Sequence, residues 1–305
     1  MKILVLGGGR SPEREVSLRS AKTVADAGRA AGFDIEEKNP ADGLNFLDEV
    51  TKDTMVFPIL HGAGGEDGVI QAALEERGLP FLGADSASSA ACFDKWLTLQ
   101  AFKEYGVPTA ESQLIKKEDF ARSELSQKPY VLKVVHGGSS IGVLIARDLS
   151  KINQEQVDEI FNMESRAVLE ELVDGIEITI PVLDDTALPV IEIVPPTGGE
   201  FDYDNKYNGK TTEICPPATV STVIQKEAQR LAEKAHKVRN CRHLSRTDFM
   251  VRPDGSLVVF DINTIPGLTD QSLYPKSAAV AGLTMPDLVK RFVDMVIRDY
   301  SIMVF

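Results

Sequence analysis

The chain has 305 residues, and its 46 acidic residues against 33 lysines and arginines give a net charge of −13 near neutral pH. This excess of negative charge argues against nucleic acid or an anionic membrane as a partner, although it does not exclude a local basic pocket. No run of about 18 apolar residues occurs, so we expect no membrane span. The length alone predicts two or three domains.

The three cysteines, Cys92, Cys215 and Cys241, are odd in number and widely spaced, and no C-x-x-C pair occurs. We therefore expect neither a disulfide framework nor a structural zinc site. A reducing compartment suits such a chain, and we expect a cytoplasmic protein.

The first predicted element is a strand at Lys2–Leu6, and a run of three glycines then leads into a helical pattern. This order predicts an α/β domain. It does not favour a dinucleotide site, because Pro12 stands where the G-x-G-x-x-G pattern requires its third glycine. Glu13 lies at the start of the helical pattern, where the helix dipole alone also favours an acid.

A second predicted strand, Thr54–Leu60, ends at His61 and is followed by a glycine-rich segment. A histidine at the carboxyl end of a parallel strand lies where open α/β sheets bind their ligands. A single histidine is more often structural, so the position alone leaves both interpretations open.

Two segments in the middle of the chain carry candidate phosphate contacts. Lys95 stands at the start of a helical pattern, where a solvated surface residue is the alternative. Residues 133–143 predict a strand, a loop of glycine and serine, and a second strand. Such a loop can fold over phosphates, because it offers backbone N–H groups without side-chain bulk. A flexible surface hairpin is the alternative here, and no Walker A sequence occurs.

The next segments are less specific. Acidic residues interrupt the apolar stretch Val168–Val173. The polar segment 201–218 lies between two structured regions, and loops of this length are usually functional or disordered. A helical pattern then runs from 223 to 243, and we expect His236 and His243 to lie on that helix in structural roles.

Two apolar segments, Phe249–Val251 and Leu257–Ile262, flank a Pro-Asp-Gly turn and predict a β-hairpin. Because side chains alternate faces along a strand, Asp261 and Asn263 share one face, and Asp248 on the first strand can oppose them. Two carboxylates and an amide oxygen suit Mg²⁺. The alternative is that these side chains only satisfy local backbone donors.

The segment around this hairpin resembles the C-terminal signature of the D-alanine:D-alanine ligases, members of the ATP-grasp superfamily. The resemblance rests on Arg246-x-Asp248, then acid-x-Asn-Thr-x-Pro-Gly-x-Thr, then Ser272-Leu273. Earlier segments resemble further motifs in the order of the family: GG-x-S-x-E-R-E-V-S-L, H-G-x-x-G-E-D-G-x-x-Q, an Asp-Lys pair, the glycine and serine loop, and D-Y-x-x-K-Y. The resemblance covers nearly the whole chain.

The resemblance implies a mixed α/β (α+β) fold of three domains, the ATP-grasp fold with an N-terminal Rossmann-like domain. We expect the domains at residues 1–87, 88–178 and 179–305, with ATP between the last two. The implied reaction is ATP-dependent ligation of two D-alanines to D-alanyl-D-alanine through an acyl phosphate, for peptidoglycan precursor synthesis. ATP and D-alanine are therefore the expected partners, and a homodimer is common in the family.

The resemblance also implies roles for single residues. Contacts with the first D-alanine fall to Glu13, Val16 and His61, and those with the second substrate to Ser272 and Leu273. Contacts with ATP fall to Lys95, Lys133, Glu170, Val173, Glu177 and Lys206. Asp248, Asp261 and Asn263 are the implied ligands of Mg²⁺ or Mn²⁺, with two ions expected. Glu13, Ser139 and Tyr207 are implied to close the site. Arg246 and a backbone N–H near Gly267 are implied to stabilise the tetrahedral oxyanion.

Two positions depart from the family pattern. Val134 replaces a usual proline, and we expect this to affect rigidity more than chemistry. Asp261 replaces a usual glutamate, and its shorter arm favours monodentate metal coordination. Tyr207, by contrast, matches the ligases that form a dipeptide rather than D-alanyl-D-lactate.

Two other functions stay open from the sequence. One is an ATP-grasp ligase for another pair of amino or hydroxy acids, against which Tyr207 and the His61 motif count. The other is a catalytically silent nucleotide-binding paralogue. Loss of Arg246, Glu13 or Ser139 would indicate such a paralogue, and all three are present.

Overall fold

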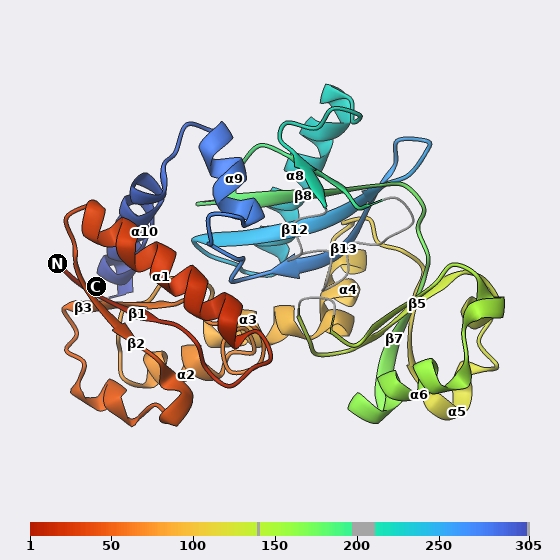
Figure 1. Ribbon diagram of the computed structural model, residues 1–305, viewed down its shortest axis with the longest axis horizontal. Coiled ribbons are helices and arrows are strands. Elements are labelled where there is room, and N and C mark those ends of the chain that lie inside the picture. The colour runs from red at the N-terminus through yellow and green to blue at the C-terminus, as the bar shows by residue number, and fades with distance from the viewer. Residues whose placement is uncertain (139–140, 197–210, 304–305) are drawn as a thin grey trace.

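The structure, a computed structural model, describes residues 1–138, 141–196 and 211–303. In that part of the chain the strands form three sheets, and helices pack against them (Figure 1). This mixture of helices and sheets is the fold class expected from the sequence. Among the same residues, no helix combines the length and apolar composition that crossing a membrane requires.

The first sheet is parallel and has the strand order β2 (Asp34–Lys38), β1 (Lys2–Leu6), β3 (Thr54–Pro58). β1 and β3 are apolar and buried, as strands covered on both faces must be, whereas the acidic edge strand β2 is mostly exposed. The helices α1 (Arg14–Ala30) and α2 (Val69–Glu76) belong to this part of the molecule.

The two faces of this sheet pack against different helices. Along β1, Ile3 and Val5 join a buried cluster that contains residues of α1. Leu4 and Leu6 point the other way and join a second cluster, which contains Ile70 of α2. This division follows from the alternation of side chains along a strand.

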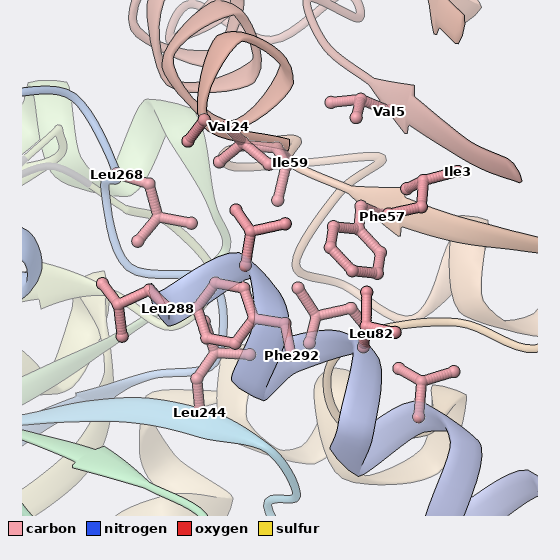
Figure 2. Packing of buried hydrophobic residues seen from close by; sticks show 14 of the residues in the cluster. Ile3, Val5, Val24, Phe57, Ile59, Leu82, Leu244, Leu268, Leu288 and Phe292 are labelled. Atoms are coloured by element: carbon pink, nitrogen blue, oxygen red, sulfur yellow. The ribbon is translucent and has the colours of Figure 1, made fainter. Parts of the chain in front are cut away.

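The last helix of the chain, α10 (Met285–Met303), completes the core of the first sheet (Figure 2). Phe292 of α10 is fully buried and meets Phe57 of β3 edge to face, with ring centroids 6.3 Å apart. Leu244 and Leu268, which come from the C-terminal part of the chain, lie in the same cluster. A shared core therefore holds the first and third sheets together. The domain boundaries given above stay a prediction.

The second sheet is antiparallel, and its strands in order are β4 (Ser112–Lys116), β7 (Arg166–Glu171), β5 (Tyr130–Val134) and β6 (Val143–Ala146). Two helices, α3 (Ser86–Phe93) and α4 (Lys95–Glu104), precede this sheet in the chain. Two more connect its strands: α5 (Lys117–Phe120) follows β4, and α6 (Gln154–Met163) follows β6. The N-terminus of α6 has a capping box, in which Asn153 and Gln156 each bond the backbone N–H of the other.

The third sheet is also antiparallel, and its strands in order are β11 (Thr212–Ile214), β10 (Ile191–Val194), β8 (Ile176–Leu183), β12 (Leu244–Val251) and β13 (Leu257–Asn263). A short strand, β9 (Thr186–Ala187), pairs with β8. Its helices are α8 (Thr222–Val238), which packs on β8 and β12, and α9 (Leu273–Val280). The hairpin predicted from the sequence is confirmed as β12 and β13.

The helix expected to reach His243 ends earlier. α8 ends at Val238, and the backbone is left-handed at Asn240 (φ 49°) and at His243 (φ 67°) before β12 begins. The expectation that both histidines lie on one helix is therefore wrong for His243, because such conformations cannot continue an α-helix. His236 does lie on α8.

Both histidines are buried and act as neutral hydrogen-bonding groups. His236 Nδ1 lies 2.7 Å from the hydroxyl of Ser245. The backbone N–H of Gly83 donates to His243 Nδ1 over 2.9 Å, and His243 Nε2 lies 3.0 Å from a carboxylate oxygen of Asp299. Burial lowers the pKa of each imidazole to about 4.

We expect the free energy of unfolding to fall when the pH is lowered from 7 to 5. A histidine in the unfolded chain titrates near its ordinary pKa of about 6.5, so in this window the unfolded chain binds protons that buried His236 and His243 do not. Each histidine should lower the stability by about 2 kcal/mol at pH 5 relative to pH 7. Denaturant unfolding measures this, and an unchanged pH dependence in the His236→Gln/His243→Gln variant would contradict it.

We also expect Phe292→Ala to lower the free energy of unfolding by about 3 to 5 kcal/mol, because it opens a cavity between α10 and the first sheet. Ile297→Ala is the matched control on the same helix. Its side chain is 39% exposed, and the loss should stay near or below about 1 kcal/mol. Equal losses in the two variants would show that α10 does not anchor this core.

Candidate active site

A cavity of about 960 Å³ is lined by strands of the second and third sheets, by α1, and by segments that follow strands of all three sheets. Its wall includes every described residue of the site predicted above: Glu13, Val16, His61, Lys95, Lys133, Glu170, Val173, Glu177, Arg246, Asp248, Asp261, Asn263, Gly267, Ser272 and Leu273. Ser139, Lys206 and Tyr207 lie outside the described residues. The fold thus gathers into one cavity side chains that are far apart in the sequence.

The hairpin brings its two acids face to face. Asp248 of β12 pairs in register with Asp261 of β13, and a register shift follows directly after Asp248. The guanidinium of Arg246 donates to both oxygens of Asp248, with Nε 2.9 Å from Oδ1 and Nη2 2.8 Å from Oδ2. The hydroxyl of Thr179 on β8 also donates to Asp248. These charge-assisted bonds fix the carboxylate at the cavity wall.

Asn263 has a local role as well as a place in the wall. Its side-chain oxygen accepts the backbone N–H of Ile265 over 2.7 Å, which is the local capping considered as the alternative to metal binding. An amide oxygen has a second lone pair, so this bond leaves one acceptor position. Within the described part of the chain, the carboxylate of Asp261 has no hydrogen-bond partner.

The donor set of the hairpin suits a hard divalent cation. No group of three or more His, Cys, Asp or Glu side chains gathers among the described residues. The candidate site instead combines two carboxylates, Asp248 and Asp261, with the amide oxygen of Asn263. Mg²⁺ is usually held by one or two carboxylates and keeps further positions for water and phosphate oxygens, so these residues fit that ion.

A buried ion pair lies on the second sheet. Glu170 of β7 pairs in register with Val131, two residues before Lys133 on β5, so the two charged side chains are diagonal neighbours. Lys133 Nζ lies 2.8 Å from Glu170 Oε2, and it also donates to the carbonyl of Phe260 on β13 over 3.2 Å. The lysine therefore connects the second and third sheets at the cavity.

The other carboxylate oxygen of this pair is available to a ligand. Glu170 Oε1 is buried, and no hydrogen-bond donor reaches it in the described part of the chain. A buried acceptor without a partner costs about 1 to 3 kcal/mol. Since Glu170 lines the cavity, a ligand that presents an N–H at this point would satisfy it.

Lys95 lies at the start of α4, where Asp94 caps the helix by accepting the backbone N–H of Leu97 over 2.8 Å. Its ammonium group donates to the carbonyl of Gly137, the residue that begins the glycine loop. The lysine therefore stands beside the loop that the sequence predicted to fold over phosphates.

His61 belongs to a hydrogen-bond relay that the sequence did not reveal. The backbone N–H of Leu268 donates to the hydroxyl of Ser20 over 3.3 Å, and this hydroxyl lies 3.1 Å from His61 Nε2. His61 Nδ1 lies 3.1 Å from the carbonyl of Ile265. The carbonyl requires a proton on Nδ1, so a neutral His61 accepts from Ser20 through Nε2. The only sequence signal for Ser20 is its place on the buried side of α1.

Glu13 lies against the glycine loop. A Cβ on Gly138 would come within 2.9 Å of Glu13 Oε2, which is closer than such atoms normally approach. Glycine at this position therefore lets the backbone of Gly138 lie directly against the carboxylate. Glu13 itself is only 6% exposed.

The turn after the hairpin is equally close-packed. Ser272 is the N-cap residue of α9, and its hydroxyl lies 2.8 Å from that of Thr269 and accepts the Thr269 N–H over 3.1 Å. A Cβ on Gly267 would come within 2.8 Å of this hydroxyl. Gly267, Ser272 and Leu273 thus form one compact edge of the cavity.

The similarity to known proteins extends over nearly the whole chain. The family described as "D-ala D-ala ligase C-terminus" matches residues 101–294 of the chain. A D-alanine–D-alanine ligase of Mannheimia succiniciproducens is 37% identical over 303 residues, which span 96% of this chain and 97% of that relative. The structure of the D-alanine-D-alanine ligase from Coxiella burnetii has a TM-score of 0.85 and 27% identity, over 99% of this chain and 95% of that chain. The Bacillus anthracis ligase complexed with ATP has a TM-score of 0.82 and 28% identity, over 99% of both chains.

Proposed function

The chain belongs to the D-alanine–D-alanine ligase family, and from this premise we propose how its own residues perform the reaction. It is an ATP-dependent ligase with the ATP-grasp fold, and it joins two D-alanines through an acyl phosphate for peptidoglycan precursor synthesis. The main support is that D-alanine–D-alanine ligases match nearly the whole chain. The single cavity that collects the motif residues supports the assignment of roles.

The adenine end of ATP lies at Glu170 in this proposal. The unpartnered Glu170 Oε1 would accept the exocyclic amino group of the base, the backbone at Val173 would contact the ring, and Glu177 would bind the ribose. Lys133, held by Glu170 and by the carbonyl of Phe260, would face the phosphates. Lys95, beside the glycine loop, would do the same.

Asp248, Asp261 and Asn263 would hold Mg²⁺ or Mn²⁺, with two ions expected. Bound there, the metal would neutralise the charge that builds on the phosphate oxygens. Asp261 in place of glutamate should favour monodentate coordination.

The first D-alanine lies against Glu13, Val16 and His61 in this proposal. Glu13 would receive its ammonium group, and the relay through Ser20 would keep His61 in one orientation. The carboxylate of this D-alanine attacks the γ-phosphorus of ATP and ADP leaves, which gives the acyl phosphate. Positioning of these groups supplies much of the rate in phosphoryl transfer.

The second step is acyl transfer. The amine of the second D-alanine attacks the acyl carbon, phosphate leaves, and the nitrogen loses a proton to form the amide. Arg246 and the backbone N–H near Gly267 would stabilise the oxyanion of the tetrahedral intermediate. Ser272 and Leu273 would bind the second carboxylate at the start of α9, where the helix dipole favours an anion.

Other parts of the proposal rest on the resemblance alone. Ser139, Lys206 and Tyr207, which lie outside the described residues, would close the site and contact the phosphates. We further propose a cytoplasmic homodimer whose domains are residues 1–87, 88–178 and 179–305.

We expect the protein to release phosphate from ATP when Mg²⁺ and D-alanine are present, and to form D-alanyl-D-alanine as identified by mass. L-alanine should give no release, and D-alanine with D-lactate should still give mainly the dipeptide. Excess chelator should abolish release, because phosphate charge would then be unscreened. Turnover with another amino acid only would overturn the substrate, and activity that persists in excess chelator would overturn the metal site.

We expect Glu170→Gln to raise KM for ATP by about 10- to 100-fold, since the change removes the counter-charge of buried Lys133 and weakens the acceptor for adenine. KM for D-alanine should stay within about twofold, because Glu170 acts only on the nucleotide. Steady-state kinetics measures both constants. Glu111→Gln, at an exposed acid beside β4, is the matched control. Equal increases in both KM values would contradict the adenine role.

A further inference from the structure

Two thiols face each other beside the cavity. Cys92 lies near the end of α3, Cys241 lies in the segment between α8 and β12, and their sulfur atoms are 3.8 Å apart. Both are free and buried, with 5% and 7% of their surfaces exposed. A disulfide requires about 2.05 Å between the sulfurs, so closure needs an approach of less than about 2 Å. Small side-chain rotations can supply much of that movement.

A cation stands next to this pair. Arg239 follows the end of α8, and its Nε and Nη2 atoms are buried without a hydrogen-bond partner in the described part of the chain. The hydrogen bond from Cys241 and the nearby Arg239 guanidinium hold the pKa of the Cys92 thiol below its ordinary value. Donation of that hydrogen bond, together with burial, raises the pKa of Cys241. The pKa of Cys92 is therefore lower than that of Cys241, so Cys92 is the thiol that more readily forms a thiolate.

Access to the pair is also unequal. Cys92 lines the cavity, as do Phe93 and Lys95, whereas Cys241 is not among the lining residues. A small solute that enters the cavity meets Cys92 first, with Cys241 directly behind it. A reactive thiol with a second thiol in reach is the arrangement of a redox-sensitive cysteine pair.

We propose that Cys92 and Cys241 form a peroxide-reactive dithiol in the wall of the nucleotide cavity, which closes to a reversible disulfide and which bound ATP shields. The shielding part rests on the proposed function of the cavity.

The chemistry takes two steps and two electrons. The Cys92 thiolate attacks one oxygen of hydrogen peroxide, so that an S–O bond forms, the O–O bond breaks and hydroxide leaves. This gives the sulfenic acid of Cys92. Cys241 then loses its proton and attacks the Cys92 sulfur, so that the S–S bond forms, the S–O bond breaks and the second hydroxide leaves. The protons of the two thiols convert both hydroxides to water. Peroxide is reduced, and the dithiol is oxidised.

The test uses the full chain with Cys215→Ser, which removes the third thiol. Cys215 is a poor competitor in any case, because burial raises its pKa to about 11. Treatment with hydrogen peroxide should remove two thiols together, and peptide mass mapping without reductant should find the Cys92 and Cys241 peptides joined. Dithiothreitol should restore both thiols. Thiols lost one at a time, or no joined peptide, would overturn the proposal.

Two variants separate the roles. In Cys241→Ser, oxidation should stop at the sulfenic acid of Cys92, which dimedone traps. In Arg239→Gln, the loss of the cation should slow the oxidation of Cys92 by about tenfold. An unchanged rate in Arg239→Gln, or dimedone labelling of Cys241 in Cys92→Ser at the rate seen for Cys92, would contradict the assignment of Cys92 as the attacking thiol.

ATP with Mg²⁺ should slow disulfide formation at least about tenfold, and titration calorimetry on the same sample shows whether ATP binds. Unslowed oxidation in protein that binds ATP would overturn the shielding. Absence of ATP binding would instead count against the proposed function, and the dithiol would still be judged by its thiol count and peptide map.

Discussion

The hydrogen-bond relay through Ser20 holds the N-terminal and C-terminal parts of the site in one arrangement. Leu268 donates to Ser20, Ser20 lies against His61, and His61 contacts the carbonyl of Ile265. Both ends of the relay are therefore backbone groups of the same short turn, the one that contains Gly267. The position of the turn relative to α1 and β3 is fixed by groups that are buried and mutually satisfied, so displacement of the turn would leave several polar groups unpaired at once.

Two pairs of opposite charge line the cavity, although the whole chain is strongly acidic. Arg246 spans both oxygens of Asp248, and Lys133 is bonded to Glu170 in a nearly dry environment. In such surroundings an ion pair is screened little, so the two charges hold each other in a defined geometry. The net charge of −13 is therefore a poor guide to this site, where local pairing decides which groups can meet a polyphosphate.

The sequence predicted those features that depend on residues close together in the chain. Alternation along the hairpin placed Asp248 opposite Asp261, and β12 and β13 have that register. The same reasoning could not find Ser20, whose partners are far away in the sequence, because a serine on the buried side of a helix looks like any small core residue. It also extended α8 to His243. Asn240 takes the left-handed conformation with which many helices end, and the N–H of Cys241 donates to the carbonyl of His236 across that end. The helical spacing of the apolar residues does not show this end.

The packing of α10 is a feature that local sequence periodicity could not predict, because it joins segments far apart in the chain. Phe292 on α10 packs against Phe57, which lies in a strand near the other end of the chain, and no local pattern in the sequence predicts that pairing. This closure returns the C-terminus to the first sheet, so the turn at Gly267 is anchored on both sides. The relay holds it directly, and the core beneath Leu268 holds it through α10. The edge of the cavity that contains Gly267 and Ser272 is therefore built on an anchored part of the fold, which suits the acyl-transfer role proposed for it, because such a site must position two reacting groups.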